Sequence, residues 1–561
     1  MTDAALDLIV VGAGAAGMTA AAVGAAEGLR VLLLEKTAQV GGTTAWSGGM
    51  VWTPANRLTA AAGRADTLDA ARRYLRQVVP GGFQSPRQEA FLNHADAAIA
   101  YLAEHTPVQL TPVNRYPDYY PDLSGATDGG RVLEPKPFDA TRLGRDFALL
   151  RPPLPEFTLF GGMMISRPDL VHFRRVGRSV RSTSRVVRLV ADYVLQRLRA
   201  PRGTTLYLGN ALAGRLLLAL IQTGVEIRTG VAIAGLAFDR DRVSGVVLAD
   251  GTRVEARRGV ILATGGFSRD SGLRARFLPE SAGALSATAP GNSGDGVRLG
   301  MAAGGEMGPA ELNAAFWVPG SRFQRADGSA GVFPHTVTDR AKPGLIAVDR
   351  TGRRFVNEAV SYHEFVLAML RGHNGGGEPA YLLCDRRFLW YYGLGRVKPF
   401  RMSLQQEIES GYLLTAPTPR ALAERIGVDP DALAATVEAF NLGAKDGLDP
   451  MFGRGGNSYQ RHLGDAGNQP NPCVAPIVKA PFYAVAVLPA DLGTATGLMT
   501  DGFARVLDRD GVPVAGLYAS GNDMHSVMNG AYPGPGITLG PALTFGYLAA
   551  RHAAGATDSE R

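Results

Sequence analysis

The chain has 561 residues, of which 46% are hydrophobic and 71 are glycine, and its net charge is +7. This length exceeds one ordinary hydrophobic core, so we expect at least two domains in a globular protein rich in tight turns. Its two cysteines, Cys384 and Cys473, are too few for a disulfide framework, which favours a reducing cytoplasm. No apolar run of about 18 residues predicts a membrane-spanning helix. The nine histidines lack metal-ligand spacing, so we expect no metal.

The first motif is a dinucleotide fingerprint. Residues 6–11 (LDLIVV) predict a buried strand; GAGAAG follows, then a helix of small residues and a second strand ending at Glu35. Glycines in such a turn let a pyrophosphate approach the helix N-terminus, and the acid can bind the adenosine ribose hydroxyls. The residues expected at the dinucleotide here are Gly12, Gly14, Ala15, Ala16, Gly17, Glu35 and Lys36.

The fingerprint alone fits NAD or FAD, and the loop after Glu35 favours FAD. Residues 41–49 read GGTTAWSGG. A loop of such small residues can run along the pyrophosphate and the ring edge of a flavin. The contacts expected from it are Gly41, Gly42, Thr43, Thr44, Ser47, Gly48 and Gly49.

An arginine-rich segment covers residues 174–202, with nine arginines against one acid, Asp192. Arg174, Arg178, Arg181, Arg185 and Arg188 recur with helical spacing, so the pattern predicts one basic face of a single helix whose other faces carry valines. Such a helix either lies on an anionic membrane surface or presents a solvated face. The arginines do not alternate with stacking aromatics, so we expect no nucleic-acid partner.

Two further strands end in glycine. One runs from Ala256 into Thr264-Gly265-Gly266, and the other from Gly516 into Gly521-Asn522-Asp523. The carboxyl ends of parallel strands meet at one edge of a sheet, where nucleotides bind. These strands are therefore expected to return to the same site.

Three tyrosine-bearing stretches stand far apart: YPDYYP (116–121), GRRFVNEAVSYHEF (352–365, with Tyr362) and YPGPG from Tyr532. Each alone is more often packing than chemistry. In the last, prolines and glycines make a stiff turn before a helical pattern that begins at Leu539. The turn either offers a phenol and unpaired N–H groups to a ligand or is only structural.

Together these features resemble the fumarate reductase and succinate dehydrogenase flavoprotein superfamily. By that resemblance, residues 292–296 (NSGDG) lead from the FAD-binding domain into a cap, and residues 489–494 (PADLGT) lead back. Trp46 stands where covalent members carry a flavin-linking histidine, so FAD is expected to be non-covalent. The histidine and arginine set that binds a dicarboxylate has no counterpart, which argues against fumarate.

The tyrosines, with EPKPFDATRLG (134–144) and RFVNE (354–358), resemble a narrower family, the 3-ketosteroid Δ1-dehydrogenases. The resemblance implies conversion of a 4-en-3-one steroid to the 1,4-dien-3-one. In that scheme Tyr362 removes the C2 proton, Tyr119 hydrogen-bonds its phenolate, and flavin N5 accepts the C1 hydride. Tyr532 and the N–H of Gly536 bind the C3 oxygen.

The resemblance also assigns neighbouring residues. Tyr116 lines the pocket, Ile537 replaces a glycine of many members and leaves the exact steroid open, and His363 is support or a bystander. The helix after Gly536 is expected to aim its N-terminus at the flavin. The remaining expected cofactor contacts are Ala263, Thr264, Gly265, Asp295, Gly521, Asn522, Gly536 and Leu539.

The expected fold is α/β. A discontinuous Rossmann-like FAD-binding domain takes residues 1–310 and 488–561, with the arginine-rich segment at about 150–205, and an α+β catalytic cap takes residues 311–487. A quinone or another acceptor is expected to reoxidise the enzyme, in the cytoplasm or at the inner face of the cell membrane. Still open are action at C4–C5 of saturated 3-ketosteroids, reduction of an activated C=C bond, a membrane-surface flavin protein without steroid turnover, and the C17 side chain of the substrate.

Overall fold

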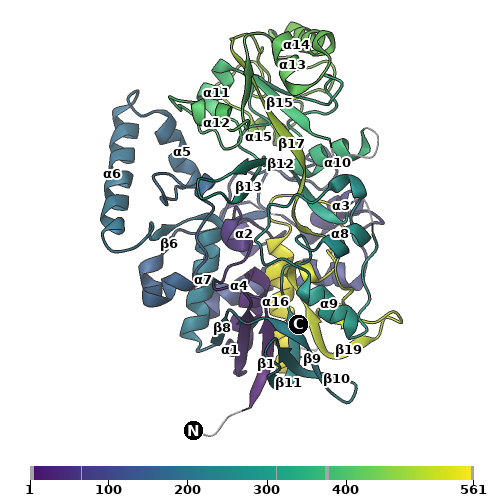
Figure 1. The fold of residues 1–561 in the computed structure, drawn as a ribbon. Helices are drawn as coiled ribbons and strands as arrows, with labels where there is room; N and C mark the ends of the chain where they lie inside the picture. The colour runs from purple at the N-terminus through teal and green to yellow at the C-terminus, as the bar shows by residue number, and fades with distance from the viewer. Residues whose placement is uncertain (1–4, 65, 311–312, 373–377, 557–561) are drawn as a thin grey trace.

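The computed structural model describes residues 5–64, 66–310, 313–372 and 378–556 (Figure 1). The strands of its larger sheet are β1 (Leu6–Val11), β2 (Val31–Glu35), β8 (Glu226–Thr229), β9 (Ile233–Asp239), β10 (Arg242–Leu248), β11 (Arg253–Leu262), β18 (Arg505–Leu507) and β19 (Pro513–Ala519). Their order is β18-β19-β11-β1-β2-β8; in addition, β10 pairs with β11, and β9 pairs with β10. The strands from β19 to β8 run parallel, whereas β18, β9 and β10 pair antiparallel. The predicted Rossmann-like sheet is confirmed.

A layer of helices covers this sheet: α1 (Ala15–Ala26), α4 (Pro86–His105), α7 (Leu208–Gln222) and α16 (Leu539–Ala554). α1 packs between α7 and α16, and α16 also packs on α4. A Cβ on Gly546 would lie 2.7 Å from the carbonyl oxygen of Ala16, so glycine is what lets α16 approach α1. Because Ala16 also packs on Ala542, the N-termini of both helices lie together.

The second sheet has the order β13-β12-β17-β15-β14, with β16 paired to β17, and its pairs are antiparallel (Figure 1). Its strands are β12 (Ala315–Gln324), β13 (Ala330–Pro334), β14 (Leu345–Val348), β15 (Ala380–Asp385), β16 (Leu414–Ala416) and β17 (Phe482–Thr494). The helices of this region are α10 (Tyr362–Arg371), α11 (Arg386–Tyr392), α12 (Gln405–Glu409), α13 (Pro419–Ile426), α14 (Pro430–Ala444) and α15 (Ser458–Leu463). These elements form the predicted α+β cap.

Strand β17 joins the two sheets' regions. It runs across the expected boundary between residues 487 and 488, and its Asp491 binds Arg274 at 2.5 Å and Ser286 at 3.0 Å. The other expected boundary, at residue 311, lies outside the described residues. The division into two domains therefore stays a prediction at its edges.

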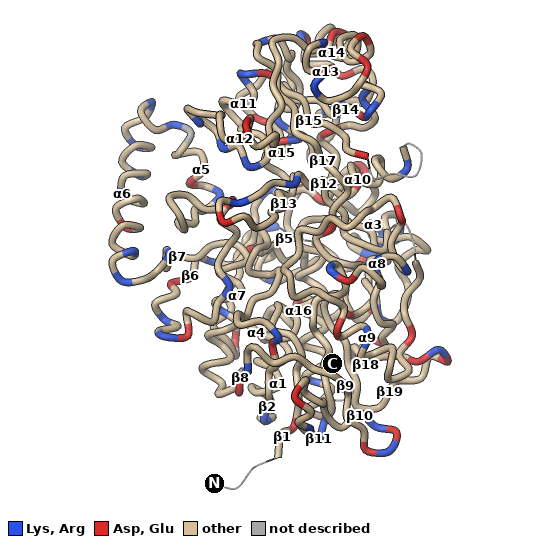
Figure 2. The backbone as a smooth tube through the Cα atoms, in the orientation of Figure 1, with Lys and Arg blue, Asp and Glu red and all other residues tan. Residues whose placement is uncertain are grey.

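The arginine-rich segment is not the single helix that its spacing predicts. It forms α5 (Arg167–Arg174) and α6 (Val180–Arg197), which pack on each other. Gly177 takes a φ of +75° in the turn between them, so the predicted five-arginine face is broken after Arg174. Arg185 turns inward and binds Asp169 at 2.9 Å. Figure 2 shows α6 at one edge of the molecule, with basic residues along it.

Short elements complete the fold. The remaining strands are β3 (Val51–Trp52), β4 (Leu110–Pro112), β5 (Val132–Pro135), β6 (Phe138–Asp139) and β7 (Thr205–Leu206). The remaining helices are α2 (Arg57–Ala61), α3 (Leu68–Val78), α8 (Ser271–Phe277) and α9 (Asp295–Ala302), with 3₁₀ turns at η1 (Thr44–Trp46), η2 (Ala140–Leu149), η3 (Pro155–Phe157), η4 (Glu280–Ala282) and η5 (Gly521–Asp523). β6 pairs with β7, so residues 140–204 leave and rejoin the body at one point. Among the described helices, none has the length and apolarity needed to cross a bilayer.

Candidate active site

The glycine turn between β1 and α1 leaves room for a phosphate group. A Cβ on Gly12 would lie 2.4 Å from the oxygen of Ala263, and one on Gly17 would lie 1.9 Å from that of Gly12, so the turn closes only with glycine at both positions. A Cβ on Gly14 would meet nothing within 4 Å, and one on Gly42 would meet only the Gly14 Cα, at 3.7 Å. No side chain caps α1 at Gly14. The first turn of α1 therefore borders open space, an arrangement in which helix N-termini bind phosphate groups.

Glu35 lies at the end of β2 beside this turn. Its Oε2 accepts a hydrogen bond from the Ala13 amide at 3.0 Å, and its Oε1 accepts bonds from the amide and hydroxyl of Thr37 at 2.9 and 2.8 Å. The carboxylate is thus held where it can receive ribose hydroxyls. Lys36 turns the other way and binds Asp295 at 2.6 Å, which ties β2 to the expected cofactor segment at residues 292–296.

The glycine-ended strands meet around one buried carboxylate. Asp523 accepts hydrogen bonds from the Gly266 amide at 2.8 Å and the Thr264 hydroxyl at 3.0 Å, and the Thr264 oxygen accepts the Gly296 amide at 3.0 Å. Burial raises the pKa of Asp523 to about 6, and its hydrogen bonds with Thr264 and Gly266 oppose that rise. The segments that converge here carry the predicted residues Ala263, Thr264, Gly265, Asp295, Gly521 and Asn522.

The small-residue loop at 41–49 folds back on the fingerprint. The Thr44 hydroxyl accepts the Ala15 amide at 3.1 Å, and a Cβ on Gly49 would lie 2.4 Å from the main chain of Leu208. Trp46 points away from the fingerprint, since its indole N–H binds the Pro152 carbonyl at 3.1 Å. The loop thus presents small side chains to the open space.

The YPGPG turn is clamped on both sides. Gly536 has a φ of +94°, and a Cβ there would lie 2.6 Å from the Met50 carbonyl. Its own carbonyl accepts the Trp52 amide at 3.1 Å, and the Tyr74 hydroxyl binds the Pro533 carbonyl at 2.6 Å. Within the described residues the Gly536 N–H donates to no group, and no side chain caps α16 at Thr538. The turn therefore leaves the Gly536 N–H without a partner among the described residues, and its ligand-binding part stays a prediction.

The three predicted tyrosines meet at one place, although they come from distant parts of the chain. The Tyr119 hydroxyl donates to the Tyr362 hydroxyl at 3.1 Å, and their rings meet edge to face at 5.7 Å. Tyr532 stacks on Tyr119 at 5.5 Å and meets Tyr362 edge to face at 5.1 Å. The Tyr119 amide binds the Pro533 carbonyl at 2.9 Å, which fixes the YPDYYP stretch against the YPGPG turn.

Burial governs the protonation of this cluster. Burial raises the pKa of Tyr362 well above its usual value, a nearby Tyr532 phenolate would raise it further, and the hydrogen bond from Tyr119 lowers it. Burial likewise raises the pKa of Tyr532 to about 12, opposed by its interaction with Tyr362. A phenol that must act as a base here needs help to ionise. The bond from Tyr119 is one such source.

Tyr459 and Phe316 complete the cluster wall, and the sequence analysis missed both. The Tyr459 ring lies 4.7 Å from that of Tyr119, and Phe316 meets Tyr532 edge to face at 5.6 Å. Neither residue stands in a recognisable motif, so no local signal marks them. His363, 5.8 Å from Tyr532, accepts the Trp317 amide; burial and the charge of Arg371 lower its pKa to about 3, so it is neutral and supports the wall.

Polar side chains stand beyond the cluster. The ring of Tyr116 packs on the ring of His462, with 4.6 Å between their centroids. Ile537, the other residue predicted in the pocket, is buried. Arg167, at the start of α5, would lie 3.7 Å from a Cβ on Gly48 and has Glu134 at 4.0 Å. Its guanidinium donates no hydrogen bond to the part of the chain that the structure describes. The positively charged Arg167 therefore stands between the small-residue loop at 41–49 and Tyr116.

Comparisons with known proteins agree with this geometry. The FAD binding domain family matches residues 7–539. The chain is 38% identical to the 4-oxocyclohex-2-ene-1-carboxylate 5-dehydrogenase of Sinomonas cyclohexanicum (98% of this chain, 94% of that one) and 36% identical to the 3-oxosteroid 1-dehydrogenase of Mycobacterium tuberculosis strain H37Rv (99% of each). A crystal structure of 3-ketosteroid delta1-dehydrogenase from Sterolibacterium denitrificans with 1,4-androstadiene-3,17-dione matches with a TM-score of 0.91 and 38% identity, over 99% of this chain and 100% of that one.

Proposed function

We infer that this chain, which belongs to the FAD binding domain family and to its 3-oxosteroid 1-dehydrogenase group, introduces a 1(2) double bond into 3-ketosteroids. The predicted cofactor, FAD, and the predicted oxidoreductase class are confirmed by these relatives. The observation that carries the reaction is the meeting of Tyr119, Tyr362 and Tyr532 beside the YPGPG turn.

Each tyrosine has one task in the proposed reaction. Tyr362, as the phenolate, takes the proton from C2, next to the ketone, and Tyr119 stabilises that phenolate before the transfer by donating a hydrogen bond to it. The Tyr532 hydroxyl and the free Gly536 N–H bind the C3 oxygen as enolate charge grows there. The aromatic wall keeps water out and strengthens these bonds. FAD, when bound, supplies the acceptor for the C1 hydride.

The test is anaerobic mixing of the purified flavoprotein with a 4-en-3-one steroid while flavin absorbance is followed. Bleaching together with formation of the 1,4-dien-3-one is expected. Tyr362→Phe should bind FAD and steroid but bleach far more slowly, and Tyr193→Phe is the control, since the Tyr193 hydroxyl on α6 binds only the Phe160 carbonyl within the described residues. Oxidation of a saturated 3-ketosteroid at C4–C5, with no reaction at C1–C2, would contradict the proposal.

A second candidate substrate is a small cyclic ketone that carries a carboxylate. Arg167 favours it, because its guanidinium stands near Tyr116 and Gly48 with only a long ion pair, 4.0 Å to Glu134, and arginine pairs well with carboxylates. The Sinomonas relative is named for such a substrate. Turnover of 4-oxocyclohex-2-ene-1-carboxylate should fall about tenfold or more in Arg167→Gln if the pair forms. Steroid turnover by the same variant should stay unchanged, and a preference for steroid with no carboxylate turnover excludes this candidate.

We also propose that the α5–α6 hairpin docks the enzyme on an anionic membrane surface. Apolar side chains stand exposed there: Val180 is 89%, Leu198 77% and Phe160 67% exposed, beside the arginines of α6. Apolar groups with nearby cations are what an interfacial helix needs. Binding to vesicles with anionic lipid should weaken in an Arg181→Gln, Arg188→Gln variant. Neutral vesicles and an Arg253→Gln variant are the controls, and unchanged binding would refute the proposal.

A quinone is the proposed electron acceptor, because a lipid-soluble acceptor is available at the same surface. Reoxidation of the reduced enzyme by a soluble quinone should be fast, and NAD⁺ should not replace it, since the charge of Glu35 and the glycine loop serve the resident nucleotide. Equal rates with oxygen alone would argue against a quinone.

A further inference from the structure

The chain segment that leads into Tyr362 is held by a buried arginine whose guanidinium binds main-chain carbonyls. Arg340 is 1% exposed. Its guanidinium donates to four main-chain carbonyls: His335 at 2.9 Å, Thr336 at 3.0 Å, Glu358 at 2.9 Å and Val360 at 3.2 Å. The last two precede Tyr362 by only a few residues, so Arg340 fixes the main chain from which this tyrosine emerges.

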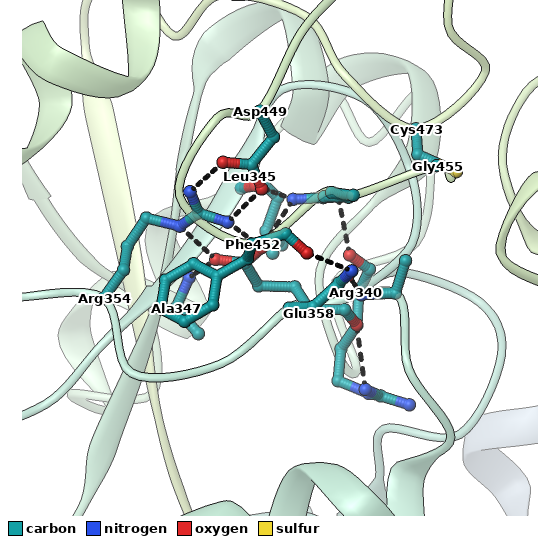
Figure 3. A network of polar contacts seen from close by, with 12 residues as sticks. Arg340, Leu345, Ala347, Arg354, Glu358, Asp449, Phe452, Gly455 and Cys473 are labelled. Atoms are coloured by element: carbon teal, nitrogen blue, oxygen red, sulfur yellow. Dashed lines mark hydrogen bonds and ion pairs between the residues drawn. The ribbon is translucent and has the colours of Figure 1, made fainter. Parts of the chain in front are cut away.

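The neighbouring carboxylates are already occupied. Glu358 and Asp449 each receive two hydrogen bonds from Arg354, at 2.7 and 2.8 Å, and Glu358 also receives one from Arg454 at 3.1 Å. In Figure 3, Glu358 lies between Arg354 and Arg340. These two acids therefore balance Arg354 and Arg454. Asp339 hydrogen-bonds His335 at 2.6 Å and also attracts the Arg340 charge, while the hydrogen bonds of the Arg340 guanidinium go to carbonyls.

The charge of Arg340 also acts on the tyrosine side of this network. Arg340 stacks over Phe365, in the first turn of α10, at 5.0 Å. Burial raises the pKa of Tyr459 well above its usual value, and the charge of Arg340 is among the groups that oppose the rise. Arg340 also interacts with Tyr119, which contacts both Tyr459 and Tyr362. A buried cation acts strongly across such short distances.

Other charged groups face the cluster from farther out or are neutralised. Glu364 binds the Tyr120 hydroxyl at 2.6 Å, and Asp118 binds Arg131 at 2.8 Å. His363 is neutral, and Arg371 acts on it. Two more groups flank Tyr116: Arg167 and His462. Arg340 is the fully buried guanidinium among these groups that interacts with two cluster tyrosines.

We propose that Arg340 is a positioning residue for the tyrosine base: it holds residues 358–360 so that Tyr362 meets Tyr119, and its charge favours the ionised form of the cluster. This rests on the proposed function of Tyr362. Arg340→Gln removes the charge but keeps an amide that can bind carbonyls. Arg340→Lys keeps the charge but loses the planar guanidinium, which donates to several carbonyls at once.

The test is the pH dependence of the limiting rate of flavin reduction by steroid. In Arg340→Gln the rise of the rate with pH should move upward by roughly one pH unit or more, because the phenolate loses a favourable charge. In Arg340→Lys that rise should stay near the wild-type position even if the maximum rate drops. Thermal unfolding of each variant separates a folding defect from this effect.

Arg215 offers a matched control. It is also buried, and it donates to the carbonyls of Pro107 at 2.8 Å, Lys136 at 3.2 Å and Pro137 at 2.7 Å. It lies on α7, over Phe138, in the FAD-binding region. Arg215→Gln should therefore lower the melting temperature without moving the pH profile. An unmoved profile in Arg340→Gln would overturn the inference and leave Arg340 with a structural part only.

A second readout does not depend on turnover. Ultraviolet titration of tyrosinate, with Tyr362→Phe subtracted, should show Tyr362 ionising at higher pH in Arg340→Gln than in wild type and Arg340→Lys. If wild-type flavin is not reduced by any steroid, the proposed function fails, and this titration still decides the part of Arg340. Identical titrations in all three proteins refute it.

Discussion

The glycine turn between β1 and α1, which we call the cradle, and the tyrosine cluster are built in opposite ways. The cradle is made of main chain. Glycine is required at Gly12 and Gly17 because a Cβ there would lie within 2.5 Å of a main-chain oxygen, and the turn borders an open space. The cluster is made of side chains, with Tyr119 and Tyr532 from two loops and Tyr362 from the start of α10 brought into ring contact. Damage to the cradle should thus cost cofactor binding and folding, whereas damage to the cluster should cost chemistry alone.

The largest expected effect is on the cluster. Tyr362→Phe should slow flavin reduction by about 10²–10⁴, the usual contribution of a positioned general base. FAD content and melting temperature should stay close to wild type, because the hydroxyl contributes one hydrogen bond at 3.1 Å, from Tyr119. Stopped-flow absorbance measures the rate. Loss of flavin from this variant would break the distinction between cluster and cradle.

Tyr532→Phe should slow the same step by about 10²–10³, as loss of one oxyanion donor does. The phenylalanine keeps the stacking on Tyr119 and the edge contact with Phe316, so steroid should still bind. Steady-state kinetics should show a lower kcat with a KM changed only a little. A raised KM with an unchanged kcat would assign Tyr532 to substrate binding.

Two glycine substitutions sharpen the comparison within the cradle. Gly14→Ala meets no protein atom, so the apoprotein should melt as wild type does while FAD affinity falls by about tenfold. Gly12→Ala adds a Cβ 2.4 Å from the Ala263 oxygen at a φ of +102°, so it should destabilise the apoprotein itself. Fluorescence titration of FAD and thermal unfolding measure both. Equal FAD affinity in Gly14→Ala and wild type would mean that the open space does not hold the pyrophosphate.

The smallest effects are those of pH, and they run in opposite directions. Reduction requires an ionised Tyr362 whose pKa burial raises, so the rate should grow with pH from neutral upward. Stability behaves inversely: a tyrosine with a raised folded pKa stabilises the fold below about pH 10 and loses that contribution as pH rises further. Melting curves between about pH 8 and pH 11 check the second part. Tyr362→Phe should flatten part of this loss.

The cradle could be predicted from sequence because its features are local. A strand, three glycines and Glu35 lie within one unit; Gly12 and Gly17 are required by close main-chain contacts, and Gly14 borders open space. The cluster could be predicted only through family resemblance, because tyrosines in separate loops carry no local signal of meeting. Tyr459 and Phe316 had no such motif and were missed.

Helical spacing gave the wrong answer in the arginine-rich segment. The spacing from Arg174 to Arg188 is that of one helix, but Gly177 turns the chain and Asp169 draws Arg185 inward. Periodicity indicates which side chains share a face if the helix is unbroken, but it does not indicate whether a glycine interrupts the helix. The excess of arginines in this segment is a property of the sequence, but the prediction that they share one face of a single helix was wrong.

The pairing of β6 with β7 has a consequence for how such chains diversify. Phe138 lies opposite Leu206 and Asp139 opposite Thr205, so the two ends of the arginine-rich excursion are adjacent neighbours in one ladder. An excursion whose ends already touch behaves as a cassette, since a short hairpin can replace it without moving the strands that carry it. Because Arg167 belongs to this excursion, recombination at this point would exchange, together with the outer surface, the arginine that stands near Gly48 and Tyr116.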